Sequence, residues 1–179
     1  MFYTHEKLAL VVDGHNLHYA AKELGRRIDY KRLLDVFACK GHLHRATYVN
    51  VTAAEGDHCT LRNLLDFVQF NGWHAVTKPA RVFQDEYGQE RTKGSIDVLV
   101  AMEAVRLASM VDHIVLFSGN GDLVPVVKYL QDSGRRVTVV SSVQASMVSK
   151  ALRRQADTFI DLADLADAIA DTREMHAAE

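Results

Sequence analysis

The chain is poor in cysteine, has no long apolar run and carries no excess of positive charge. Its two cysteines, Cys39 and Cys59, lack the spacing of a metal-binding motif, and a reduced cytoplasmic protein is the simplest interpretation. The apolar run Leu8–Val12 is far shorter than the roughly 20 residues of a membrane-spanning helix, so no membrane association is expected. The formal net charge of -2 gives no support for nucleic-acid binding through an overall basic field, and leaves room only for a local basic patch.

What is present indicates a globular α/β protein. The 179 residues, 48% hydrophobic and 25% charged, fit a single domain spanning residues 1–179 with a substantial core. Strand-like and helix-like segments alternate, which predicts a doubly wound, mostly parallel sheet of about five to six strands with helices on both faces. Strands are expected at Leu8–Val12, Arg45–Val51, Trp73–Val82, His113–Phe117, Arg136–Ser141 and Thr158–Ile160. Helices are expected at His15–Leu24, between Asp29 and Gly41, and at Cys59–Asn71, Ser95–Ser109, Leu123–Asp132, Ser146–Gln155 and Leu162–Ala170.

Two of the expected strands end in acidic and amide residues. The first runs into Asp13-Gly14-His15-Asn16 and the fourth into Ser118-Gly119-Asn120-Gly121-Asp122, where the glycines let the backbone turn sharply. Open α/β sheets carry their chemistry at the carboxyl ends of the strands, so one site built from both ends is expected. Each residue also has a structural explanation. Asp13 and Asp122 are good helix caps, Asn16 can cap or orient Asp13, and Asn120 tolerates a left-handed turn.

Asp97 is harder to explain by structure alone. It lies in the Ser95–Ser109 helix, which is apolar almost all round and therefore expected to be buried, where an unpaired carboxylate is costly. The alternative is an exposed first-turn Asp favoured by the helix dipole, with Ser95 as cap. Glu103, six residues on, lies about 240° around the helix and suits a solvated or supporting role. Asp13, Asp97 and Asp122 can converge where the strand order reverses, a donor set suited to Mg²⁺ or Mn²⁺ and to hydrolysis of a phosphodiester.

Three segments together resemble a known family. Val12–Leu17, Lys93–Val98 and Leu116–Pro125 resemble the three signatures of NYN domains, the LabA-like branch of the PIN-like nucleases, and the tail with Gly134–Val140 and Ala156–Asp161 fits as well. The resemblance implies a Rossmann-like, PIN-like fold and metal-dependent cleavage of RNA. It also implies the following site residues. The acidic centre would consist of Asp13, Asp97, position 120 and Asp122, with Asn16 supporting Asp13 and Ser118 shaping the turn.

The chain departs from the family pattern at Asn120, where the family usually has Asp. An amide oxygen can still bind a cation, but it brings no negative charge, so the site is expected to be weakened. Three explanations fit: an engineered inactivating change, a natural pseudo-nuclease, or a site that works with three acids. The family often has Asp at position 103, and Glu103 is the milder change.

Basic residues flank the polar segment Phe83–Gly94, which is expected to be a loop or a short hairpin. They are Lys78, Arg81, Arg91 and Lys93. With Tyr87 they could hold an RNA backbone and stack a base, or they could simply be solvated. Lys93 lies four residues before Asp97, on the same side if the helix extends that far back. A homodimer is expected, because one small domain offers little area to grip RNA.

These patterns leave three functions. The leading one is a metal-dependent ribonuclease, and the second is a catalytically dead RNA-binding or regulatory NYN module. The third, a phosphatase of the haloacid dehalogenase type, needs a second Asp two residues after the first, where this chain has His15. The histidines form no zinc motif, and Ser118 lacks the nucleophile-elbow context of a serine hydrolase.

Overall fold

A computed structural model describes residues 1–52, 59–79, 81–84, 90–93, 95–144 and 147–171 of the chain. Six parallel strands form one sheet in the order β3-β2-β1-β6-β7-β8, and two antiparallel strands form a separate hairpin. The sheet strands are β1 (Lys7–Asp13), β2 (His42–Thr52), β3 (His74–Pro79), β6 (His113–Phe117), β7 (Arg136–Ser141) and β8 (Thr158–Asp161). The hairpin strands are β4 (Arg81–Gln84) and β5 (Glu90–Lys93).

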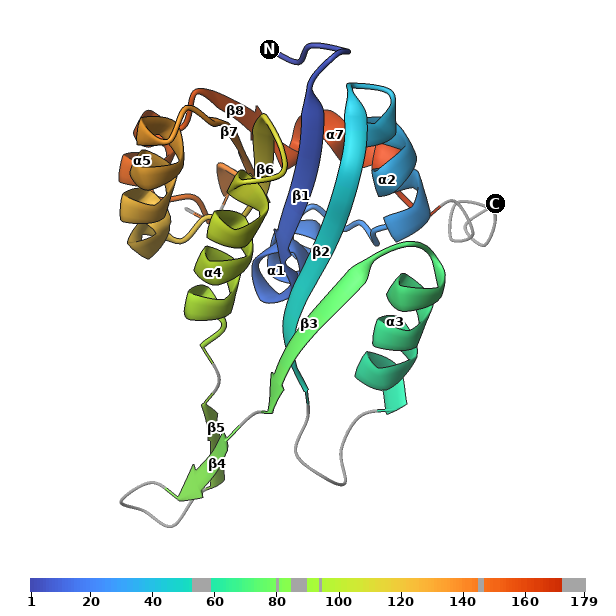
Figure 1. Ribbon diagram of the computed structural model, residues 1–179. Coiled ribbons are helices and arrows are strands. Elements are labelled where there is room, and N and C mark those ends of the chain that lie inside the picture. The colour runs from blue at the N-terminus through green and yellow to red at the C-terminus, as the bar shows by residue number, and fades with distance from the viewer. Residues whose placement is uncertain (53–58, 80, 85–89, 94, 145–146, 172–179) are drawn as a thin grey trace.

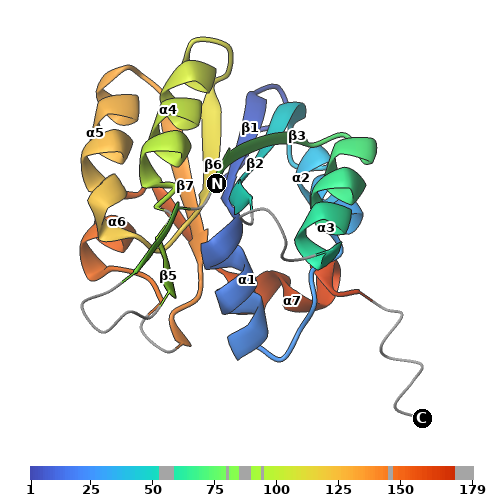
Figure 2. The same cartoon turned by 90° about the horizontal axis from the view of Figure 1, so that it is seen from below.

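Helices cover both faces of the sheet (Figures 1 and 2). One layer contains α4 (Asp97–Ala108), α5 (Val124–Asp132) and α6 (Lys150–Gln155). The other contains α1 (Gly14–Glu23), α2 (Tyr30–Ala38), α3 (Cys59–Phe70) and α7 (Leu162–Ile169). A short 3-10 helix, η1 (Gly121–Leu123), precedes α5. The expected Rossmann-like α/β fold is therefore confirmed. No helix among the described residues has the length and apolarity needed to cross a membrane.

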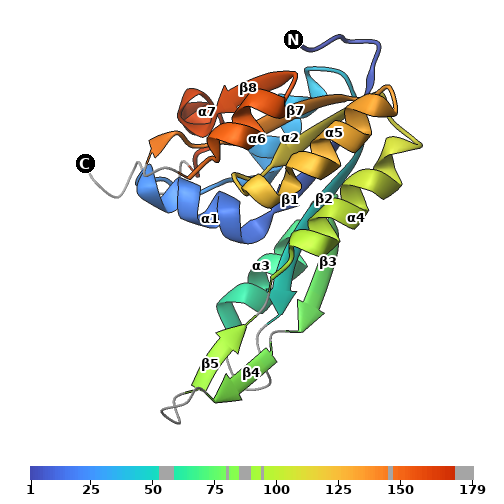
Figure 3. The same ribbon diagram turned by 90° about the vertical axis from the view of Figure 1, so that its left-hand side faces the viewer.

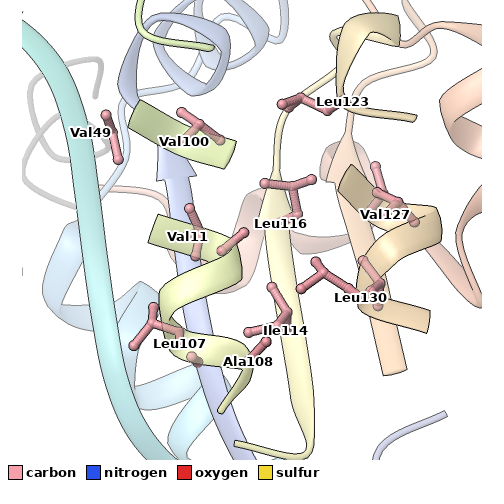
Figure 4. Close-up of a cluster of buried hydrophobic side chains, with 14 of the residues drawn as sticks. Val11, Val49, Val100, Leu107, Ala108, Ile114, Leu116, Leu123, Val127 and Leu130 are labelled. Carbon is pink, nitrogen blue, oxygen red and sulfur yellow. The ribbon is translucent and has the colours of Figure 1, made fainter. Parts of the chain in front are cut away.

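Burial on both faces explains why the central strands are apolar without alternation. Figure 4 shows Val11, Ile114 and Leu116 of the sheet packed against Val100 and Leu107 of α4. The alternate residues of the same strands point to the other layer. There Leu10, Val12, Val115 and Phe117 pack among the side chains of α1, α2 and α7.

The structure differs from the sequence-based expectations in three elements. The expected strand Trp73–Val82 is divided near its carboxyl end into β3 and β4. The polar segment that follows was expected to be a loop or a hairpin, and its described residues form a hairpin. The helix expected from Ser146 begins only at Lys150, where the Ser149 side chain caps it. The expectation that α4 is buried all round is wrong, because Val98 is 72% exposed and Met102 60% exposed. Only one side of α4 packs on the sheet.

The strand order places the ends of β1 and β6 side by side. From β1 the chain moves outward to β2 and β3, then returns to the other side of β1 as β6. Val12 pairs with Phe117, so Asp13 and Ser118 follow at the same edge of the sheet. Open α/β sheets bind ligands at the point where the strand order reverses in this way.

His113 is buried at the opposite, amino-terminal end of the sheet strands, and it is expected to make the stability of the fold depend on pH. His113 Nε2 lies 2.8 Å from Thr138 Oγ1, and Nδ1 lies 3.2 Å from an Arg136 nitrogen. Burial, and next the charge of Arg136, lower the pKa of His113 to about 4. The unfolded chain binds this proton more tightly, near pH 6.5. The unfolding free energy is therefore highest above pH 6.5 and falls as the pH is lowered. The loss reaches about 3 kcal/mol at pH 4.

Urea unfolding of the chain and of His113→Gln checks this prediction. Between pH 7 and pH 5 the chain should lose about 2 kcal/mol more of its unfolding free energy than the variant loses. Parallel pH profiles for the two proteins would contradict the prediction, because they would show that His113 titrates alike in the folded and unfolded states.

Candidate active site

Asp13, the last residue of β1, is the most buried acid at the carboxyl edge of the sheet and is only 5% exposed. Its Oδ1 accepts a hydrogen bond from the backbone N–H of Asn16 at 2.9 Å, so Asp13 caps α1. Its Oδ2 accepts a hydrogen bond from Ser118 Oγ at 3.3 Å. One carboxylate therefore links the helix that follows β1 to the end of β6. Its role as a cap is real, but it does not account for the second contact.

The charge of Asp13 is poorly compensated. Burial raises the pKa of Asp13, and the nearby Asp97 carboxylate adds to the rise. The Asn16 N–H, the neighbouring His15 and the Ser118 hydroxyl oppose the rise without cancelling it. A buried carboxylate that resists ionisation beside a second carboxylate gains from a bound cation, and such perturbed groups cluster at functional sites.

Asp97 opens the first turn of α4, where the positive end of the helix dipole favours an anion. Ser95 Oγ donates a hydrogen bond to Asp97 Oδ2 at 2.7 Å. Ile96 occupies the N-cap position, so Ser95 holds the carboxylate but is not the cap residue. Lys78 Nζ donates to the Ser95 carbonyl at 3.3 Å, which brings a cation from β3 to the same turn. The part-buried Asp97 is close enough to Asp13 to change its pKa, so the two carboxylates share one electrostatic site.

Asn120 has extended backbone angles, with φ -71 and ψ 120, so the left-handed turn weighed as one explanation is not present. Its Oδ1 accepts a hydrogen bond from the Asp122 N–H at 2.9 Å and thereby caps η1. Its own N–H donates to Ser118 Oγ at 3.2 Å, the hydroxyl that contacts Asp13. Asp122 lies exposed in the first turn of η1. A carbonyl oxygen has two lone pairs, so the capping bond leaves Asn120 Oδ1 one further position.

The glycine at the end of β6 is required by a close approach of two chain segments. A Cβ on Gly119 would lie 1.9 Å from the carbonyl oxygen of Met147, and the Ser149 N–H donates to the Gly119 carbonyl at 2.9 Å. The sharp turn attributed to these glycines therefore does not depend on a positive φ. Among the described glycines, positive φ angles belong to Gly25, Gly72 and Gly134.

Two further polar residues at this edge were not expected from the sequence. Ser141, at the end of β7, donates a hydrogen bond to Asn16 Oδ1 at 3.3 Å. Asn16 therefore supports Asp13 with its backbone and contacts β7 with its side chain. Asn50, near the end of β2, is buried beside Gly14 and donates to the hydroxyl of Tyr48 at 3.1 Å. The available signal was that these residues also lie at strand ends.

The donor chemistry of the site fits a hard cation only in part. Within the described ranges, no three His, Cys, Asp or Glu side chains are grouped so that they could hold a metal ion. Asp13 and Asp97 lie near each other, and Asn120 is linked to Asp13 through Ser118. All three offer oxygen. Mg²⁺ commonly binds one or two carboxylates and completes its shell with waters and substrate phosphates, so this smaller donor set is compatible with it.

The remaining predicted residues lie around this centre. Glu103 pairs with Arg106 at 2.6 Å further along α4, and its supporting role stays a prediction. The β4–β5 hairpin projects beyond the carboxyl ends of β1, β2 and β3 (Figures 1 and 3). Its backbone places Arg81 opposite Lys93 and Phe83 opposite Arg91. The side chains of Arg81, Arg91 and Lys93, and the whole of Tyr87, lie outside the described residues.

Comparison with known proteins identifies the family. The model of the NYN domain matches residues 7–164, nearly the whole chain. The chain belongs to the NYN domain family. It is 29% identical over 167 residues to the low amplitude and bright protein LabA of Synechococcus elongatus, a match that covers 92% of this chain and 88% of that protein. The resemblance to LabA-like NYN proteins inferred from three short motifs is therefore confirmed.

A solved structure shares the NYN fold of this chain. The crystal structure of VPA0982, a protein of unknown function from Vibrio parahaemolyticus, superposes with a TM-score of 0.76 at 25% identity. The match covers 96% of this chain and 100% of that one. NYN domains are PIN-like nuclease domains, so family membership supports a nuclease role for this chain.

Proposed function

We propose that this NYN protein is a metal-dependent ribonuclease with its centre at Asp13 and Asp97, weakened by Asn120. One observation carries the proposal. A buried carboxylate with a raised pKa lies within electrostatic range of a second carboxylate, at the point where the strand order reverses. The role of Asp13 as a cap explains its contact with Asn16, but it does not explain the contact with Ser118 or the nearby charge of Asp97. We propose that the protein acts in the cytoplasm, where RNA substrates occur.

Asp13, Asp97 and the amide oxygen of Asn120 would hold Mg²⁺ or Mn²⁺, with Asp122 at the exposed rim. When bound, such a cation supplies Lewis acidity and neutralises charge at a phosphodiester. The protein side chains provide orientation. Ser118 and the Asn16 N–H fix the carboxylate of Asp13 from two sides.

Substrate phosphates would be attracted to the first turn of α4. Ser95 holds Asp97 there, and Lys78 adds a positive charge beside it. We extend this role to the hairpin residues Arg81, Arg91 and Lys93, which follow Lys78 at the same end of the sheet. Phosphate contacts of this kind position RNA without reading its sequence.

Incubation of the chain with labelled single-stranded RNA tests the proposal. Full-length RNA is expected to disappear slowly in Mn²⁺ or Mg²⁺ and to persist when a chelator is present. Cleavage that continues unchanged in chelator would contradict a metal-dependent mechanism.

The second candidate is an RNA-binding module without cleavage. One observation favours it: the side chain of Asn120 already has a structural task as the cap of η1, which a neutral amide performs well. RNA binding without cleavage under every cation condition would support this candidate. The homodimer expected from the small size of the domain stays a prediction for either function.

A further inference from the structure

A groove of about 690 Å³ lies on the helical layer of α1 and α3, beyond the acidic centre. Figure 2 shows these two helices side by side on the same face of the sheet. One wall consists of α1 and the connection that follows it, and the other consists of α3. Residues that line it include His18, Lys22 and Arg26 on the first wall and Leu64 and Phe67 on the second. Ligand sites typically occupy 300 to 1,000 Å³, so a nucleotide fits a space of this size.

A row of basic side chains joins the acidic centre to this groove. His15, His18 and Lys22 are three and four residues apart and therefore share one side of α1. His15 is close enough to Asp13 to lower its pKa, which places the start of the row at the proposed centre. His18 and Lys22 are exposed and line the groove. The distance along α1 from His15 to Lys22 is about 10 Å, a span that a few nucleotides cover.

The charge of the groove is predominantly positive. Lys22, Arg26 and Arg27 line it, with Asp171 as the acid among the described lining residues. Arg26 also pairs with Asp167 at 3.2 Å, and both side chains are substantially exposed. An exposed pair of this kind contributes little and is readily exchanged for a phosphate partner. This local positive charge contrasts with the formal net charge of -2 for the chain.

The opposite wall offers an aromatic surface. Phe67 of α3 lines the groove and is 40% exposed, so part of its ring is accessible to a ligand. Aromatic rings facing a positively charged groove are the surfaces on which single-stranded nucleic acids stack their bases. A basic wall and an aromatic wall together match the two parts of a nucleotide, its phosphate and its base.

We propose that the groove between α1 and α3 binds single-stranded RNA a few nucleotides away from the phosphodiester held at Asp13 and Asp97. Lys22 and Arg26 contact phosphates, and Phe67 stacks a base. The inference rests on the proposed function, because it takes RNA as the ligand of the acidic centre. The groove then lengthens the RNA that the domain can hold, which a single small domain needs for a firm grip.

Fluorescence anisotropy with a fluorescein-labelled single-stranded RNA of about 12 nucleotides, in chelator to prevent cleavage, tests the inference. Phe67→Ala should weaken binding at least about fivefold, since stacking contributes roughly 1–3 kcal/mol per base. Lys22→Gln should weaken binding. It should also make the negative slope of log K against log salt less steep by about one unit. The matched control is Lys128→Gln, which removes an exposed lysine from α5 on the other layer and should leave both quantities unchanged.

The outcomes separate the groove from the proposed function. If the chain binds RNA and both groove variants bind like Lys128→Gln, the groove inference is wrong and the ribonuclease proposal is unaffected. If neither the chain nor any variant binds RNA, the proposed function itself fails. Circular dichroism is recorded to check that the Phe67→Ala protein is folded, and Lys22→Gln, at an exposed position, gives an independent result.

Discussion

Asp13→Asn is expected to reduce RNA cleavage by at least about 100-fold and, at neutral pH, to raise the melting temperature. The two effects have one cause. The pKa of Asp13 is raised in the folded protein, mainly by burial, so its ionised form destabilises the fold. Asn has nearly the same shape and still accepts a hydrogen bond from the Asn16 N–H, but it carries no charge to bind a cation.

The pH dependence of this effect has a definite sign. A carboxyl whose pKa is raised by folding binds its proton more tightly in the folded state, so its cost is absent in acid and grows above the ordinary pKa of 3.8. The difference in melting temperature between Asp13→Asn and the unchanged chain should therefore be largest near pH 7 and disappear toward pH 4. Asp122→Asn makes the same substitution at an exposed position and serves as the control, for which no comparable rise in melting temperature at pH 7 is expected. A variant that melts below the chain at pH 7 would show that the buried carboxylate stabilises the fold.

Asn120→Asp is expected to increase the affinity for Mn²⁺ by about 10- to 100-fold, the range over which groups around a metal typically change its binding. The new carboxylate can still accept the Asp122 N–H, so the cap of η1 is retained while a negative charge is added. Without a cation, the extra charge near Asp13 should lower the melting temperature, and Mn²⁺ should restore it. Isothermal titration with Mn²⁺ and thermal unfolding measure the two quantities.

Asn16→Asp is the matched control for this experiment. Asn16 lies at the same edge of the sheet, but its side chain contacts Ser141 and not the Asn120 network. A carboxylate at position 16 adds a similar negative charge to this edge of the sheet, but it places no new metal ligand at position 120. Equal gains in Mn²⁺ affinity for the two variants would indicate a general electrostatic effect and would remove position 120 from the ligand set.

Much of the fold follows from local patterns in the sequence. The bounds of β6 and β7 agree with the expected strands, because strands buried on both faces form short apolar runs that are bounded by polar residues. The Asp29 cap of α2 was likewise expected. The local pattern did not distinguish the exposed residues Val98 and Met102 from the buried residues of α4. An apolar side chain at helical spacing looks the same in the sequence whether or not another element covers it.

The candidate site was predictable as far as topology determines it. The strand order reverses at β1, which brings Asp13 and the end of β6 together, and the hydrogen bond from Ser118 to Asp13 reflects this. The bond from Ser141 to Asn16 joins residues 125 positions apart and depends on the final register of three strands. Likewise, the reason for Gly119 is visible only once the Met147 carbonyl has been placed against it. Such contacts leave no local pattern in the sequence.

The most direct test of the account is the rate at which Asn120→Asp cleaves a labelled single-stranded RNA in Mn²⁺. The unchanged chain and the double variant Asn120→Asp/Asp13→Asn are measured beside it, each also in chelator. Asn120→Asp is expected to cleave faster than the chain and to stop in chelator, and the double variant is expected to be at least about 100-fold slower than Asn120→Asp. If no form cleaves RNA while all of them bind it, the acidic edge of the sheet is not a nuclease centre and the protein acts as an RNA-binding module.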